Sequence, residues 1–135
     1  MSLARTLVTS LALAVVLALP VAAAQNPDPR TKPETAVAHA IRLLEAKEYV
    51  KFVQAFVPPD DLKRAIEQGA SVEQFGEGVG RRAERLVSAL KSIKDTAPTF
   101  DAEGKTATYK LKEAVFGTRD ALVFIKIGEF WYLQN

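Results

Sequence analysis

The spacing of apolar residues changes along this 135-residue chain, from the period of a helix to the period of a strand. Before Lys94, apolar residues recur every three or four positions, which is the pattern of an amphipathic helix. After Pro98 they alternate with polar residues, as in a strand with one buried face. Helices followed by strands are typical of the α+β class. We therefore predict N-terminal helices packed on a C-terminal antiparallel sheet of about four strands.

Four helices are expected in the first part of the chain, over residues 34–46, 49–57, 62–68 and from 72 to about 94. The first has apolar residues at the 0, +3, +4 and +7 spacing of one buried stripe. Asp60 and Asp61 follow a pair of prolines and are expected to cap the third helix, which Gly69 ends. Ser71 with Gln74 three residues later is the capping-box signature of the fourth helix.

The alternating part of the sequence first predicts two strands joined by a turn at Glu103-Gly104. In the second of these strands, the apolar residues Ala107, Tyr109 and Leu111 alternate with threonines and lysines. A further turn region is expected over residues 116–120.

The last predicted element is a hairpin of residues 121–127 and 130–134, closed by Gly128-Glu129. A two-residue turn with glycine first favours the type II′ geometry and pairs Ile127 with Phe130. One face then carries Val123, Ile125, Ile127, Phe130 and Tyr132, and the other carries Leu122, Phe124, Trp131 and Leu133. Because an antiparallel sheet usually shows water one polar face, we expect the second apolar face to be covered by curling helices, a ligand or another chain.

Two stretches of the chain resemble the nuclear transport factor 2-like superfamily, a cone of curved sheet wrapped around helices. Residues 40–49, AIRLLEAKEY, are similar to that family's opening helix, charged kink and aromatic start of the second helix. Residues 124–133, FIKIGEFWYL, are similar to its last hairpin, with a glycine turn before a tryptophan. The resemblance spans residues 34–134 and implies that the sheet is curved. This fold hosts isomerases, dehydratases, transport adaptors and exported domains of unknown role, so it implies no particular chemistry.

The first 24 residues have the pattern of a cleavable signal peptide. Arg5 gives a positive start, residues 6–19 are mostly apolar, and Pro20 precedes small residues. The apolar stretch is shorter than the roughly 20 residues of a membrane-spanning helix. We expect cleavage between Ala24 and Gln25, and a secreted or periplasmic mature protein without a membrane span.

After the expected cleavage site, residues 25–33 are predicted to be an extended, proline-rich spacer. Residues 34–135 are predicted to form one α+β domain.

Composition excludes several classes of function. The chain has no cysteine, which excludes disulfides, thiol nucleophiles and thiolate metal sites. Loss of the leader would remove Arg5 and no acid, leaving 17 basic and 16 acidic side chains, so we expect no nucleic-acid partner. No metal or cofactor motif is found, and we predict that the protein uses no cofactor.

Two clusters on the fourth predicted helix are interpreted as structural. The three glycines within residues 76–80 do not follow a strand, as those of a phosphate-binding loop would. We expect the first and last of them to allow close packing against the sheet. Arg81, Arg82 and Arg85 have Glu84 among them and Glu77 four residues before Arg81, and they are predicted to form a solvated, ion-paired face.

Four residues are candidates for ligand binding: Tyr109, Trp131, Tyr132 and His39. The three aromatic residues lie on the predicted sheet, where core packing is the alternative. His39 is the only histidine and lies off the buried stripe of the first helix, as a surface or boundary residue does.

Three hypotheses of function follow. The first is an exported, non-enzymatic interaction module that forms a homodimer through the second apolar face of its sheet. The second is a binder of a small apolar ligand inside the cone, lined by Tyr109 and Trp131. The third is an isomerase- or dehydratase-like enzyme with His39 or Glu113 as its base, where Glu113 is the only acid inside a predicted strand.

Overall fold

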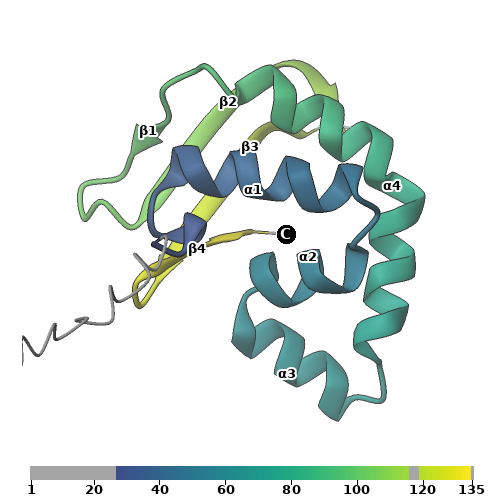
Figure 1. Cartoon of the computed structure of the whole chain (residues 1–135). Helices are drawn as coiled ribbons and strands as arrows, with labels where there is room; N and C mark the ends of the chain where they lie inside the picture. The colour runs from purple at the N-terminus through teal and green to yellow at the C-terminus, as the bar shows by residue number, and fades with distance from the viewer. Residues whose placement is uncertain (1–26, 116–118, 135) are drawn as a thin grey trace, which may run out of the picture.

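The computed structural model describes residues 27–115 and 119–134, with no account of the side chains at 113–115 (Figure 1). The predicted signal peptide, its cleavage site between Ala24 and Gln25, and residues 116–118 of the second turn region lie outside the described residues. Within the described part of the chain, no helix is both long enough and apolar enough to cross a membrane.

The described residues form helices first and strands after, so the predicted α+β fold is confirmed. The helical elements are a short 3-10 turn η1 (Pro29–Thr31), α1 (Pro33–Glu45), α2 (Tyr49–Phe56), α3 (Pro59–Glu67) and α4 (Val72–Ile93). The strands are β1 (Thr99–Phe100), β2 (Thr106–Val115), β3 (Arg119–Ile127) and β4 (Phe130–Leu133). They form one antiparallel sheet in the order β1-β2-β3-β4, which is open and curls around the helices (Figure 1).

The predicted capping box of α4 is confirmed. The Ser71 hydroxyl accepts a hydrogen bond from the Gln74 backbone N–H, and the Gln74 side-chain oxygen accepts one from the Ser71 N–H. The predicted cap of α3 is wrong, because that helix begins at Pro59, ahead of the two acids. Proline suits the first helical position, so Asp60 and Asp61 lie in the first turn. Their negative charges interact favourably there with the positive end of the helix dipole.

The glycines of α4 do not break the helix, which is continuous through them. A Cβ at Gly76 would lie 3.1 Å from a methyl carbon of Val50, and one at Gly80 would lie 3.0 Å from the ring of Tyr49. The prediction that these glycines pack against the sheet is therefore wrong. They allow α4 to approach the start of α2 instead.

The register of the last hairpin agrees with the prediction, with Ile127 opposite Phe130 and Phe124 opposite Leu133. Gly128 has a φ of 64°, and Lys47 is the only non-glycine residue with positive φ in the described part, so the turn fits type II′. One correction concerns the preceding turn. Arg119 and Asp120 belong to β3, because Arg119 already pairs with Val115.

The core lies between the helices and one face of the sheet. The sheet contributes the buried side chains Ala107, Tyr109, Leu111, Leu122, Phe124 and Trp131. Helix α1 faces them with the stripe predicted from the sequence, which includes Val37, Ala40 and Leu44. This side of the sheet is therefore the buried one.

The proline-rich segment differs from the extended spacer predicted for it. Pro29–Thr31 form a 3-10 turn, and the Asp28 carboxylate caps it by accepting a hydrogen bond of 2.9 Å from the Arg30 N–H. The Arg30 guanidinium donates to the Ala55 carbonyl of α2 at 3.1 Å. It also lies 4.3 Å from the centre of the Phe130 ring. The folded part of the chain thus begins before residue 34, because proline's fixed φ also suits a tight 3-10 turn.

Candidate functional site

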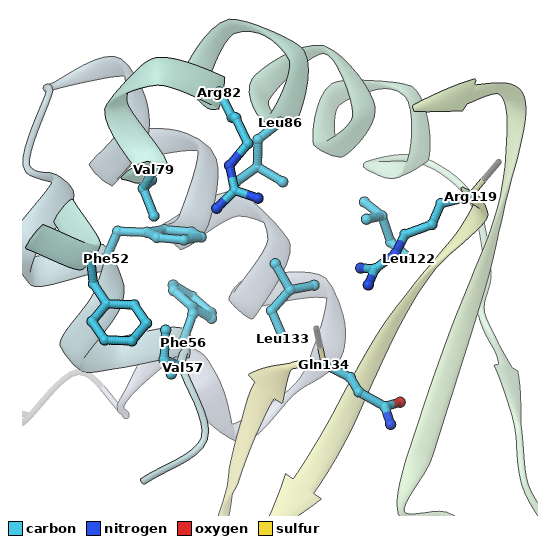
Figure 2. Close-up of a pocket in the computed structure, with 11 residues that line it drawn as sticks. Phe52, Phe56, Val57, Val79, Arg82, Leu86, Arg119, Leu122, Leu133 and Gln134 are labelled. Carbon is cyan, nitrogen blue, oxygen red and sulfur yellow. The ribbon is translucent and has the colours of Figure 1, made fainter. Parts of the chain in front are cut away.

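A cavity of about 430 Å³ lies between helices α2 and α4 and strands β3 and β4 (Figure 2). Eight of the eleven described residues that line it are apolar, and the other three are polar. The apolar side chains among them include Phe52, Phe56, Val79, Leu86, Leu122 and Leu133.

Helical and strand periodicity together bring these residues to one place. Phe52 and Phe56 are one turn apart on α2, with ring centroids 5.2 Å apart. Val79 and Leu86 lie seven residues apart on α4 and therefore share a face of that helix. The opposite wall comes from Leu122 on β3 and from the end of β4. Since each wall belongs to a regular element, the cavity is formed without a ligand.

Two arginines also line the cavity. Arg82 comes from α4 and Arg119 from the first residue of β3, and both guanidinium groups point toward the cavity (Figure 2). The Nε of Arg82 donates a hydrogen bond of 3.3 Å to the Gly78 carbonyl, which fixes the direction of this side chain along α4. The other polar side chain on the wall is Gln134. Among the described lining residues there is no acid and no histidine.

Two of the predicted ligand-binding residues, Tyr109 and Trp131, belong to the packed core. Tyr109 is 1% exposed and Trp131 is 4% exposed. The Tyr109 ring packs edge-on against Phe124, with centroids 5.9 Å apart, and Trp131 contacts Phe100. Neither is among the residues that line the cavity.

The Tyr109 hydroxyl is a buried polar group with no hydrogen-bond partner among the described residues. Burial raises the pKa of this hydroxyl to about 12, and the charge of Glu34 at the start of α1 adds to the effect. The hydroxyl stays protonated at neutral pH and is costly to bury.

Tyr132 and His39 lie in a second polar region, around the N-terminal turn. Tyr132 is 7% exposed, with its ring centre 5.8 Å from the Arg30 guanidinium. The hydrogen bond from Arg30 holds the pKa of the Asp28 carboxyl below its usual range. This region anchors the η1 turn to α2 and β4.

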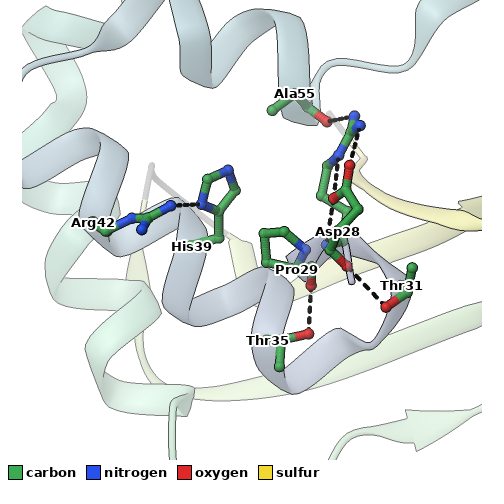
Figure 3. A network of polar contacts seen from close by, with 8 residues as sticks. Asp28, Pro29, Thr31, Thr35, His39, Arg42 and Ala55 are labelled. Carbon is green, nitrogen blue, oxygen red and sulfur yellow. Dashed lines mark hydrogen bonds and ion pairs between the residues drawn. The ribbon is translucent and has the colours of Figure 1, made fainter. Parts of the chain in front are cut away.

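His39 contacts Arg42 on the same helix, with 2.6 Å between Nδ1 and a guanidinium nitrogen (Figure 3). Its ring also lies 5.8 Å from that of Phe56. Partial burial, and then the positive charge of Arg42, lower the pKa of His39. His39 is not among the residues that line the cavity, and the Glu113 side chain lies outside the description, so the proposed enzymatic bases stay predictions.

Arg81, Arg82 and Arg85 are exposed, as the predicted solvated face requires. Arg81 does form the predicted pair with Glu77, at 3.9 Å. Arg82, however, shares its helix face with Val79 and Leu86, and an arginine on an apolar stripe marks the edge of a buried region. Among the described residues, no group of three or more histidines and acids is placed to hold a metal ion.

In comparisons with protein families, characterised proteins and solved structures, no family model, protein or structure matched this chain.

Proposed function

We propose that this chain is an exported, non-enzymatic binding module that takes a small apolar molecule into the cavity between α2, α4, β3 and β4. The observation that carries the proposal is the cavity itself, with its volume of about 430 Å³ and its eight apolar lining residues. Ligand sites in proteins are concave, mainly apolar and usually about 300–1,000 Å³ in volume, with a few polar groups that orient the ligand. Arg82, Arg119 and Gln134 would be those polar groups here.

The free energy gained by burying apolar surface favours a small apolar ligand. Each Å² of apolar surface removed from water contributes about 25 cal/mol, and the aromatic and leucine side chains of the wall supply such surface. The side chains are held by helices and strands, so little conformational entropy is lost when a ligand enters. The proposal includes the predicted leader, and also membership of the nuclear transport factor 2-like superfamily. The order of helices and curled antiparallel sheet supports the superfamily membership.

The test is a titration of the purified protein with N-phenyl-1-naphthylamine, an apolar dye whose fluorescence rises on leaving water. We expect saturable binding with one site per chain. The variant Val79→Phe adds a ring to the cavity wall and is expected to abolish binding. The matched control is Val87→Phe on the same helix, because Val87 lines a different groove. No saturable binding, or equal binding by both variants, would overturn the proposal.

Self-association through the outer face of the sheet is the second candidate function. One observation favours it: Ile127 of β3 is 42% exposed, and Val123 and Ile125 on the same face are only half-buried. A second copy of the chain would cover these side chains. Light scattering after size exclusion should then report a dimer at micromolar concentration, and Ile127→Lys should return it to a monomer. A strict monomer would exclude this candidate.

A further inference from the structure

We infer that the ligand of this cavity is a short peptide of apolar residues, which pairs with the edge of β3 beyond the end of β4 and places its side chains in the cavity. This rests on the proposed function and adds the chemical class of the ligand. The two paired strands have unequal lengths, because β3 has nine residues and β4 has four. Their paired residues on β3 run only from Phe124 to Ile127.

The free part of the β3 edge lies at Ala121. In an antiparallel sheet, successive residues of a strand direct their backbone N–H and C=O groups to opposite neighbours. The Val123 carbonyl accepts a hydrogen bond from the Gln134 N–H, so Val123 faces the β4 side. Lys126 donates to the carbonyl of Lys105, the residue before β2, so the even-numbered residues face the β2 side. The backbone groups of Ala121 therefore point to the β4 side, where no described residue pairs with them.

The cavity lies beside this edge. Leu122 of β3 lines it together with Leu133 and Gln134 at the end of β4, so the part of β3 that continues past β4 borders the same space (Figure 2). An uncovered strand edge is a template for an added strand, because its N–H and C=O groups alternate in the way that an extended peptide requires. Free backbone groups and an apolar cavity thus meet at one place.

The period of a strand decides which peptide side chains enter the cavity. A peptide residue opposite Ala121 exchanges two hydrogen bonds with it, and its side chain lies on the same face of the sheet as that of Ala121. The peptide residues before and after it point to the other face, which carries the buried side chains of Leu122 and Phe124. Apolar residues suit these two positions, because that face lies toward α2 and α4.

Backbone pairing distinguishes a peptide from other apolar ligands. A hydrocarbon or an alcohol fills the apolar space and leaves the Ala121 N–H and C=O to water. An extended peptide supplies both a donor and an acceptor to them. Neither of these hydrogen bonds depends on the arginine side chains of the cavity wall.

The experiment displaces N-phenyl-1-naphthylamine from the purified protein with the neutral peptide acetyl-Leu-Ala-Leu-amide and with two N-methylated forms of it. A methyl group on the nitrogen of the central alanine removes the donor to the Ala121 carbonyl and should weaken displacement about five-fold, the effect of one net hydrogen bond. The matched control has the methyl group on the nitrogen of the last leucine. That N–H points away from β3, so displacement should be unchanged.

The variant Ala121→Pro tests the same pairing from the side of the protein. Proline removes the N–H that points to the free edge, and a sheet accepts proline where the lost N–H is not part of the ladder. The variant should bind the peptide about five-fold more weakly and the dye as the wild type does. Ala121→Val keeps the N–H and should bind both like the wild type. Where Ala121→Pro fails to bind the dye, the two methylated peptides decide the result.

The outcomes separate the ligand class from the function on which it rests. Failure of the peptide to displace the bound dye, or an equal loss with both methylated peptides, would overturn the peptide ligand and leave the apolar cavity standing. Unchanged peptide affinity in a folded Ala121→Pro would overturn the pairing with β3. Failure of the dye to bind would overturn both the ligand class and the proposed function.

Discussion

Replacing Tyr109 by phenylalanine should stabilise the protein, although tyrosine at this position is almost completely buried. The side chain is 1% exposed, and its hydroxyl has no hydrogen-bond partner among the described residues. A buried hydroxyl without a partner costs about 1–3 kcal/mol. Phenylalanine keeps the edge-on contact with Phe124 and removes only the hydroxyl, whose space is too small to leave a large cavity.

We expect Tyr109→Phe to raise the free energy of unfolding by about 1 kcal/mol, measured by urea denaturation. The melting temperature should rise by roughly 4–8 °C for a domain of about 100 residues. The matched control is Tyr132→Phe, because the Tyr132 hydroxyl interacts with the Arg30 guanidinium. That variant should lose about 0.5–1.5 kcal/mol.

The pH dependence gives a second measure of the same hydroxyl. Its pKa is about 12 when folded and 10 when unfolded, so the unfolded chain releases this proton first as the pH rises. Stability is therefore lost from pH 10 upward, and the difference between wild type and Tyr109→Phe should widen between pH 10 and 12. A destabilised Tyr109→Phe, with a loss as large as that of Tyr132→Phe, would refute the reasoning that the hydroxyl is unpartnered.

Three further predictions concern the helices and the N-terminal turn. Gly78→Ala should stabilise the protein by up to about 1 kcal/mol, since a Cβ at this position meets nothing within 4 Å. Gly80→Ala should be less stable than Gly78→Ala, because its Cβ would press on the ring of Tyr49. Thermal melts of the two variants check this. Arg30→Met should cost about 1–2 kcal/mol in urea denaturation, because the variant leaves the Ala55 carbonyl without its donor, and an unchanged midpoint would contradict an anchoring role. Because the pKa of His39 is lowered in the folded state, its contribution to stability should be complete above pH 6.5 and be lost as the pH falls below that value. His39→Gln should therefore reduce the change in the free energy of unfolding with pH below 6.5. An equal pH dependence in both proteins would contradict this prediction.

Much of the fold follows from local sequence signals. The register of the last hairpin could be predicted because a two-residue turn at Gly128-Glu129 leaves only one pairing, beginning with Ile127 opposite Phe130. The capping box at Ser71 is equally local, since its two hydrogen bonds join residues three apart. These features depend on neighbours in the chain and need no knowledge of the tertiary structure.

The errors arise where two local signals compete or where the partner is distant. Asp60 is a good capping residue, but Pro59 is a better first residue of a helix, and the helix begins there. Gly80 indicated a close approach of backbone to another element, but its spacing does not say that the element is α2. The proline-rich segment has a compositional signature of a spacer, yet Arg30 docks it onto α2 and Phe130.

The candidate site was the least predictable part, because its wall combines α2, α4 and the ends of two strands. The two apolar faces of the last hairpin make Tyr109 and Trp131 predicted ligand-binding residues, with core packing as the alternative. Helices α1 and α4 instead bury the face of the sheet that carries them, and the cavity lies where α2 meets β4. Only the position of Arg82 on the apolar stripe of α4 could have indicated the cavity from sequence.

The most direct test of ligand binding in the cavity is methyl NMR of the purified protein during titration with 1-decanol. A ligand in the cavity should cause saturable shifts at the methyl groups that line it, those of Val79, Leu86, Leu122 and Leu133. Ile66 on α3 and Ile127 on the outer face of β3 should not shift, because both lie outside it. Shifts confined to those two exposed isoleucines, or no saturable shift at any methyl group, would contradict a ligand-binding cavity.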